Sequence, residues 1–158
     1  MNLAEQLIER VRKGRKRIVV VGDALLDVWV RGRVEASQDG CQKFVVESDV
    51  TTLGGAANAH QCLKYWKVDI GGLFTYPEEV WPIKTRFVDA DGKIVSRWDD
   101  ERDLAEACRE DFGWGYARRG VTDMLKHADA VLLSDYDKGF LTLELIAEVV
   151  ESCKRRRV

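Results

Sequence analysis

Two aspartates, Asp23 and Asp27, follow an apolar, β-branched run at Lys16–Gly22. A run that is apolar on both faces predicts a buried parallel strand, and ligands of α/β sheets bind where such strands end. A carboxylate at that place can accept hydrogen bonds from two vicinal hydroxyl groups, which is the chemistry of polyol recognition. Residues 23–27 are therefore predicted to form a ligand-facing turn. Asp23 has an alternative role as the cap of a helix after the strand.

A second candidate binding element is the pair of glycines Gly54 and Gly55, followed by Asn58. Glycines allow the backbone to approach a ligand closely, and the N–H groups that open a helix attract oxygen-rich ligands. Asn58 lies one helical turn further on and can both donate to and accept from a hydroxyl group. In the alternative interpretation the glycines form an ordinary turn, and Asn58 makes local hydrogen bonds at the helix start.

Lys138 follows a third apolar run, Ala128–Ser134, and is placed to meet the phosphate of a sugar phosphate. The alternative is a solvated turn formed with Gly139. The acidic residues Asp99–Glu101 are interpreted as a solvated strand end. No catalytic residue is predicted. No metal site is predicted either, because the cysteines form no CxxC pair and the only histidines are His60 and His127.

The elements that position these residues predict an α/β fold. Three apolar strands, Lys16–Gly22, Val68–Phe74 and Ala128–Ser134, alternate with helical segments, which favours a doubly wound parallel sheet. The expected helices are Leu3–Val11, Ala56–Trp66, Asp103–Glu110, Gly120–His127 and Leu141–Cys153.

Four other strands have polar residues on one face and predict a small antiparallel sheet beside the main one. Asp89–Gly92 ends in Asp-Gly and predicts a hairpin between the last two of them. The whole chain, 1–158, is expected to form one partial domain, with these strands within 28–47 and 83–99. The four strands are Val28–Arg33, Lys43–Glu47, Ile83–Val88 and Ile94–Trp98.

Composition limits the classes of partner. The net charge of −2 gives no overall positive field for nucleic acid. No stretch approaches the roughly 20 apolar residues that cross a bilayer, and no signal peptide is evident. The basic clusters Arg12–Arg17 and Lys154–Arg157 are interpreted as solvated helix ends. Scattered cysteines suit a reducing compartment, so we expect a cytoplasmic protein.

Several motifs, in order, resemble those of PfkB/ribokinase-type sugar kinases, with heptose-phosphate kinases the most similar group. Gly22–Asp27 is similar to the opening GDxxLD motif, and Gly54–Asn58 to GGAAN. Lys84–Arg86 and Arg97–Asp99 resemble paired strands of the family's lid, and the segment Ala128–Gly139 resembles its SDYxKG turn. The resemblance covers nearly the whole chain from about residue 3.

The resemblance implies a truncated ribokinase-like sheet carrying a small antiparallel β lid. It implies a substrate site at Asp23, Asp27, Gly54–Gly55, Asn58 and Lys138, with Asp27 binding the sugar hydroxyls. The lid strands imply a homodimer, because a lone sheet of this kind is only marginally stable in water. The large apolar side chains expected at that interface are Trp29, Phe44, Val46, Phe87 and Trp98.

The sequence has no GxGD motif, no NxxE after a strand, as in the family's second half, and no Walker-type loop. It therefore lacks the anion site, metal-organising residues and base on which phosphoryl transfer depends. We expect the chain to correspond to the N-terminal half of a kinase, inactive alone and without a cofactor, whereas a complete relative uses ATP and Mg²⁺. It is then half of a split kinase completed by a second chain, or a non-catalytic dimeric module that binds sugar phosphate weakly. An unrelated nucleotide-binding domain is disfavoured because no GxGxxG follows the first strand.

Overall fold

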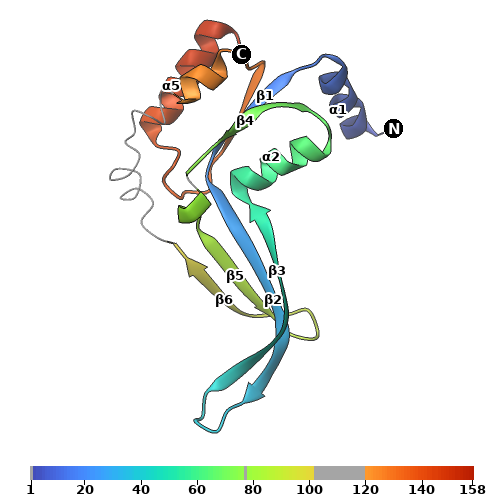
Figure 1. Ribbon diagram of the computed structural model, residues 1–158, viewed down its shortest axis with the longest axis vertical. Helices are drawn as coiled ribbons and strands as arrows, with labels where there is room; N and C mark the ends of the chain where they lie inside the picture. The colour runs from blue at the N-terminus through green and yellow to red at the C-terminus, as the bar shows by residue number, and fades with distance from the viewer. Residues whose placement is uncertain (1, 77, 102–119) are drawn as a thin grey trace.

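A computed structural model describes residues 2–76, 78–101 and 120–158. Figure 1 shows an elongated molecule, in which a helix-bearing part contains both chain ends and a long sheet projects away from it. The predicted helix at Asp103–Glu110 lies outside the described residues. Among the described residues, no helix is both long and apolar enough to cross a membrane.

The helix-bearing part is built on a parallel sheet of three strands, β1 (Arg17–Gly22), β4 (Asp69–Phe74) and β7 (Ala130–Ser134). β1 lies in the middle and pairs with both neighbours in parallel. Val19, Val20 and Val21 of β1 are completely buried, as expected for a strand that is apolar on both faces. The three apolar strands predicted from the sequence are confirmed, and so is the mixed α/β class.

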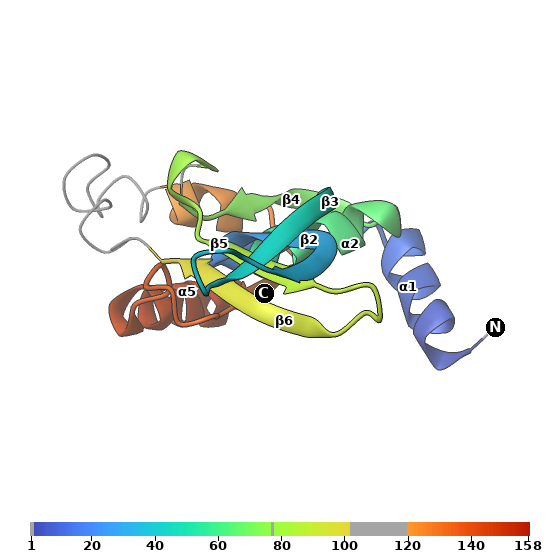
Figure 2. The same cartoon turned by 90° about the horizontal axis from the view of Figure 1, so that it is seen from below.

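Helices cover the sheet and confirm the predicted alternation. They are α1 (Leu3–Lys13), α2 (Gly55–Tyr65) and α5 (Leu143–Arg156), together with the short 3₁₀ helix η1 (Glu78–Val80); residues 120–125 are also helical. Val19 and Val21 pack with Leu145 and Val149 of α5, whereas α2 contacts the sheet elsewhere. Figure 2 shows α2 and α5 well apart.

The projecting sheet, called the lid below, has the order β3-β2-β5-β6. Its strands are β2 (Ala24–Ala36), β3 (Gln42–Gly54), β5 (Ile83–Val88) and β6 (Ile94–Asp100). The Asp-Gly hairpin is confirmed, because Asp89 Oδ1 accepts from the N–H groups of Asp91 and Lys93.

Two predictions about the lid are wrong. Residues 24–27 are not a turn, because β2 begins at Ala24 directly after β1. The lid is also mixed rather than antiparallel, since β5 runs parallel to β2. The physical reason is a main-chain hydrogen bond of 2.8 Å from Leu26 N–H to the carbonyl of Pro82. It brings β5 in beside the start of β2, so both strands leave the core in the same direction.

Gly55 is a glycine that the junction of lid and core requires. Its φ is +56°, and a Cβ built there would lie 2.1 Å from the carbonyl oxygen of Asp23. Gly92 also has a positive φ, +81°, but nothing lies within 4 Å of its Cβ position. Alanine substitutions at the two glycines therefore distinguish the energetic cost of a positive φ from the energetic cost of the steric contact.

We predict that Gly92→Ala lowers the free energy of unfolding by about 1 kcal/mol, the cost of a left-handed alanine. Gly55→Ala should cost at least about 2 kcal/mol more, because the added methyl group meets backbone that cannot move aside. Urea unfolding followed by circular dichroism measures both. Equal losses in the two variants would contradict the close approach at Gly55.

Candidate functional site

Asp23 lies at the junction of β1 and β2 and is completely buried. Its Oδ2 accepts from the N–H groups of Tyr136 at 2.8 Å and Lys138 at 3.2 Å. Its Oδ1 accepts from Phe140 N–H at 3.0 Å. The three donors come from the turn after β7, called the 135–140 turn below. Asp23 therefore holds this turn in place, since a buried carboxylate must have its hydrogen bonds satisfied.

The main chain of Asp23 extends the same junction. Its N–H donates to the carbonyl of Ser134 at 3.0 Å, and its own carbonyl accepts from Ala56 N–H at 2.8 Å. One residue thus joins β1, β7 and the first turn of α2. No helix follows β1, so the alternative prediction of a helix cap is wrong. Direct contact of Asp23 with a substrate stays a prediction.

Asp27 lies in β2 and forms an ion pair with Arg86 of the neighbouring strand β5. Its Oδ1 accepts from Arg86 Nη1 of β5 at 2.5 Å, and the two side chains are 23% and 21% exposed. The Arg86 guanidinium also lies 4.7 Å from the ring centre of Trp29. A Cβ on Gly54 would lie 2.6 Å from Asp27 Oδ2, so glycine leaves the room that this carboxylate occupies. The structure therefore brings Asp27 and Gly54 together, as the sequence predicts.

Further charged side chains share the face of the lid that carries Asp27. Asp27 is paired in register with Lys84, which is paired with Asp99, and Arg86 is paired with Arg97. Cross-strand partners project from the same side of a sheet. The charged lid face is therefore defined by Asp27, Lys84, Arg86, Arg97 and Asp99.

The charged lid face meets the 135–140 turn. Lys84 Nζ lies 5.9 Å from the ring centre of Tyr136. Lys138, whose side chain is 15% exposed, forms an ion pair of 2.5 Å with Glu101, just past the end of β6. Arg97 donates to Asp99 and lowers the pKa of that carboxyl group, and the charges of Lys84 and Lys138 lower it further. Lys138 thus lies in the same electrostatic environment as the lid residues.

Gly55 and Asn58 lie at the start of α2, next to this region in the chain. Gly55 is buried, and no side chain caps the helix, whose first N–H groups include the Ala56 donor to Asp23. Asn58 is exposed, and its Oδ1 accepts a 3.7 Å hydrogen bond from the Cys62 thiol. That local bond is the alternative role that the sequence left open. A sugar contact by Asn58 stays a prediction.

Sequence reasoning missed most of the cations of the site. The sequence predicts Lys84, Arg86 and Arg97 only as parts of lid strands, and Glu101 only as part of a solvated strand end. The signal was the spacing of charged residues at 84 and 86 and at 97 and 99, which puts each pair on one face of its strand. Only the register shows that the two pairs share the same face.

The site offers two kinds of hydrogen-bonding group. The carboxylate of Asp27 is an acceptor for hydroxyl groups, and the cations of Lys84, Arg86 and Lys138 are donors that suit an anion such as phosphate. The described residues contain no group of three or more His, Cys, Asp or Glu side chains that could hold a metal ion. This arrangement suits a ligand that combines hydroxyl groups with a negative charge.

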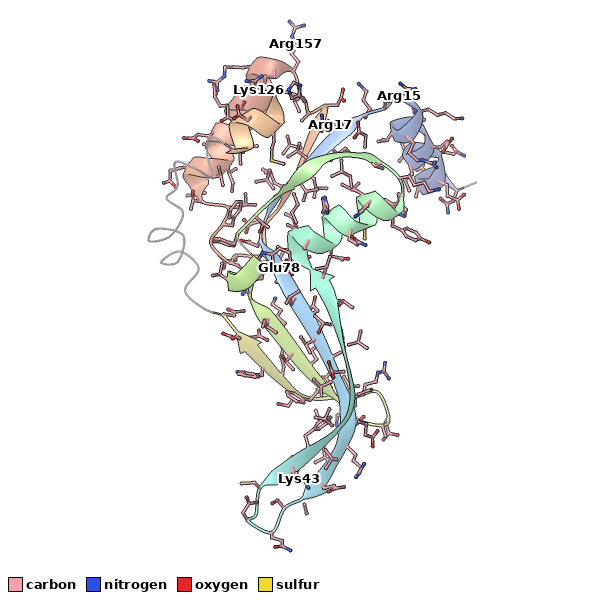
Figure 3. The ribbon with its side chains drawn as sticks, viewed as in Figure 1. Arg15, Arg17, Lys43, Glu78, Lys126 and Arg157 are labelled. Carbon is pink, nitrogen blue, oxygen red and sulfur yellow. The ribbon has the colours of Figure 1, made fainter. Side chains whose placement is uncertain are left out.

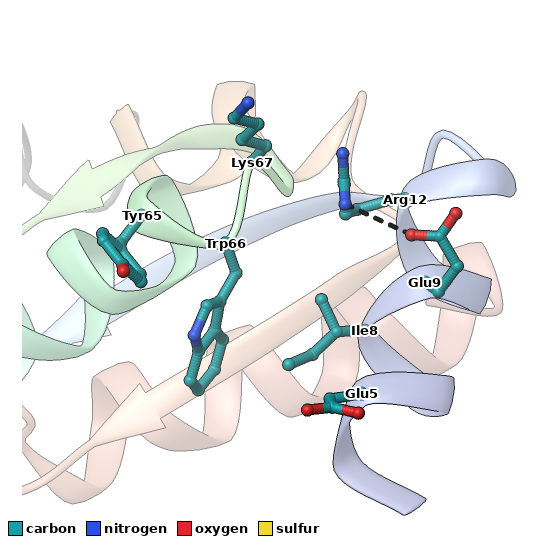
Figure 4. A pocket seen from close by; sticks show the side chains of 7 residues that line it. All are labelled: Glu5, Ile8, Glu9, Arg12, Tyr65, Trp66 and Lys67. Atoms are coloured by element: carbon teal, nitrogen blue, oxygen red, sulfur yellow. Dashed lines mark hydrogen bonds and ion pairs between the residues drawn. The ribbon is translucent and has the colours of Figure 1, made fainter. Parts of the chain in front are cut away.

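A separate pocket of about 400 Å³ lies between α1 and the end of α2 (Figure 4). It is formed by Ile8 and Trp66 with charged neighbours, among which Glu9 and Arg12 form an ion pair of 3.2 Å. None of the predicted site residues lines it.

Similar proteins agree with the resemblance noted in the sequence. No protein-family model matches the chain. It is 28% identical over 171 residues to the bifunctional protein HldE of Geobacter metallireducens, covering 89% of this chain and 34% of that protein. It is 26% identical to HldE of Helicobacter pylori strain G27, covering 85% of this chain and 34% of the relative. The chain thus spans about a third of the length of these curated relatives.

Solved structures show the same fold. A carbohydrate kinase from Agrobacterium tumefaciens has a TM-score of 0.53 at 16% identity, with 90% of this chain and 51% of that chain covered. Phosphofructokinase-2 from Escherichia coli has a TM-score of 0.52 at 11% identity, with 90% and 52% covered. The chain therefore has a ribokinase-like α/β fold. Its sequence is similar to part of the bifunctional protein HldE.

We predict that Asp23→Asn lowers the free energy of unfolding by about 3 kcal/mol. The amide removes the charge and points an N–H₂ group at buried N–H donors, which leaves at least one of them unsatisfied. Urea unfolding measures the loss. Asp135→Asn is the matched control, because Asp135 is exposed in the same turn and bonds only Asp137 N–H within the described residues. Similar losses in the two variants would contradict the role assigned to Asp23.

Proposed function

We propose that the chain is the substrate-binding part of a ribokinase-like sugar kinase and that it binds a sugar phosphate between the charged lid face and the 135–140 turn. The observation that supports this most is the Asp27–Arg86 pair held beside Gly54, with Lys84 and Lys138 next to it. The similarity to HldE and to carbohydrate kinases supports the same assignment.

Each group has a distinct part in this proposal. Asp27 accepts hydrogen bonds from sugar hydroxyl groups, and Arg86 fixes the orientation of its carboxylate. Asn58 and the backbone at Gly54 and Gly55 bind further hydroxyl groups at the start of α2. Lys84 and Lys138 bind the phosphate of the ligand. Asp23 positions the 135–140 turn, and its direct contact with the sugar stays a prediction.

We further propose that this chain alone transfers no phosphate. The sequence has no GxGD motif to supply an anion site and a base, and the described carboxylates form no cluster for Mg²⁺. ATP and Mg²⁺ belong to a complete kinase of this kind, in which a second polypeptide segment or chain supplies those groups. A cytoplasmic location stays a prediction.

The lid carries a second candidate function, homodimer formation. Phe44 and Phe87 pack edge to face, with ring centres 5.2 Å apart. Val46 and Trp98 share their face of the sheet by register and are 55% and 65% exposed. Trp29 lies on the opposite, charged face, so the predicted five-residue surface is reduced to four. We propose that two copies pack these faces together, since an exposed apolar patch of this kind favours association.

We predict that heptose 7-phosphate binds weakly, with a dissociation constant of about 1 mM, because one half of a kinase site leaves the ligand partly solvated. Asp27→Asn should weaken binding at least about tenfold, since the amide no longer accepts from two hydroxyl groups with a full charge. Calorimetric titration measures both. Asp49→Asn is the matched control, because Asp49 is exposed on the other face of the lid.

Lys138→Met should remove the preference for the phosphorylated sugar over the free sugar, whereas Lys43→Met at the far tip of the lid (Figure 3) should not. Equal affinities for wild type and Asp27→Asn would exclude Asp27 from the site. ATP turnover by the purified chain that Asp27→Asn abolishes would contradict the proposal that catalysis needs a second half.

We predict that the wild-type chain is a dimer at low micromolar concentration and that Phe44→Asp makes it a monomer. A charge placed in the apolar face must be desolvated when two faces meet, and this cost exceeds what a small interface gains. Multi-angle light scattering measures the mass. Ser48→Asp, at an exposed position of β3 on the opposite face of the lid, is the control for added charge. A monomeric wild-type protein would reject the lid dimer.

A further inference from the structure

The connection between β4 and β5 contacts both the lid and the 135–140 turn. The Thr75 hydroxyl group accepts from the N–H of the first residue of β2 at 3.0 Å, and the carbonyl of Pro82 accepts from a second N–H of the same strand at 2.8 Å. Figure 3 shows Glu78 of this connection where the lid leaves the core. Tyr76, which lies between Thr75 and Pro82 in the chain, contacts the turn. The connection therefore ties the start of the lid to that turn.

Tyr76 is buried, and its ring packs edge to face on Phe140 with ring centres 4.8 Å apart. Its hydroxyl group donates to the carbonyl of Lys138 at 3.2 Å, and its own main-chain carbonyl accepts from Trp81 Nε1 at 2.8 Å. A phenylalanine would fill the same space in the core. The hydroxyl group of Tyr76 therefore contributes the contact with Lys138, and the ring contributes the packing.

The main chain of Lys138 is thus held on both sides by buried groups. Its N–H donates to Asp23 Oδ2 at 3.2 Å, and its carbonyl accepts from Tyr76. Its side chain instead reaches the end of the lid, where it pairs with Glu101. Because the side chain starts from the Cα atom, the two main-chain hydrogen bonds limit where the ammonium group can lie. A binding group that is positioned in advance loses less entropy when its ligand arrives.

We propose that Tyr76 is a positioning residue that sets the selectivity of the sugar-phosphate site for phosphate, a role that rests on the function proposed above. Lys84 and Lys138 are the two cations assigned to the phosphate. Lys84 follows Pro82 closely in the chain, and the carbonyl of Pro82 is bonded to β2. Tyr76 fixes Lys138 from the same connection. One short segment therefore holds both lysines at a fixed separation.

Phosphorylated and free sugars depend differently on the separation of the two lysines. A phosphate group bridges two ammonium groups only if both lie within hydrogen-bonding distance of its oxygens. In the proposed site the sugar hydroxyl groups bind Asp27, whose carboxylate is oriented by Arg86 and not by the connection. Loss of the Tyr76 hydroxyl group should therefore weaken binding of the phosphorylated sugar and leave binding of the free sugar unchanged.

Tyr76→Phe tests this role because it keeps the ring and removes only the hydroxyl group. Titration of the ¹⁵N-labelled protein with heptose 7-phosphate and with free heptose, followed at the amide signal of Asp27, measures both affinities. The affinity for heptose 7-phosphate should fall about fivefold, the effect of losing one neutral hydrogen bond, and the affinity for heptose should not change. Tyr65→Phe, at an exposed tyrosine at the far end of α2, is the matched control and should change neither affinity.

Lys138→Met shows whether Tyr76 acts through the lysine. In that background Tyr76→Phe should not weaken heptose 7-phosphate further, because the positioned group is absent. The positioning role of Tyr76 would be overturned by unchanged affinities in Tyr76→Phe, by equal weakening of both ligands, by a loss that persists without Lys138, or by failure of Tyr76→Phe to fold. The sugar-phosphate site would stand in each case, since the wild-type protein would still prefer heptose 7-phosphate. A wild-type protein without that preference would overturn both the site and the role of Tyr76.

Discussion

The carboxylate of Asp23 is a charge removed entirely from water, and the surrounding structure is arranged to satisfy it. Three main-chain N–H groups of one turn converge on its two oxygens. A buried carboxylate without such donors would cost several kcal/mol. The turn must therefore close around Asp23, and its closure fixes Tyr136 and Lys138 at the carboxyl end of β7. The carbonyl of the same residue fixes the start of α2.

The lid depends on this junction for its direction. Because Ala24 follows Asp23 without a turn, β2 leaves the core as a continuation of β1. Pro82 then brings β5 in alongside β2, and the parallel register puts Lys84 and Arg86 on the face of Asp27. The cations of the lid and Lys138 of the turn consequently come together at one end of the lid. Gly54 and Gly55 have no side chain, and this leaves the space in which neighbouring atoms approach them closely.

The sequence predicts those parts of the fold whose signals are local. Apolar runs identify β1, β4 and β7, helical spacing identifies α2 and α5, and Asp-Gly identifies the hairpin between β5 and β6. The extent of β2 and the direction of β5 are set by pairing and by the Leu26–Pro82 hydrogen bond, which leave no local pattern. The same holds for the site. Asp27 and Lys138 follow from motifs, whereas the contribution of Arg86 and Arg97 follows from register, and the burial of Asp23 follows from the turn that surrounds it.

The most direct test of the sugar-phosphate site is to locate a bound ligand on the protein by nuclear magnetic resonance. Titration of the ¹⁵N-labelled chain with heptose 7-phosphate should shift the amide signals of Asp27, Lys84 and the 135–140 turn most strongly, with smaller changes at the start of α2. Largest shifts at the α1–α2 pocket of Ile8 and Trp66 would contradict the proposed sugar-phosphate site. The absence of any shift at millimolar ligand would contradict it equally.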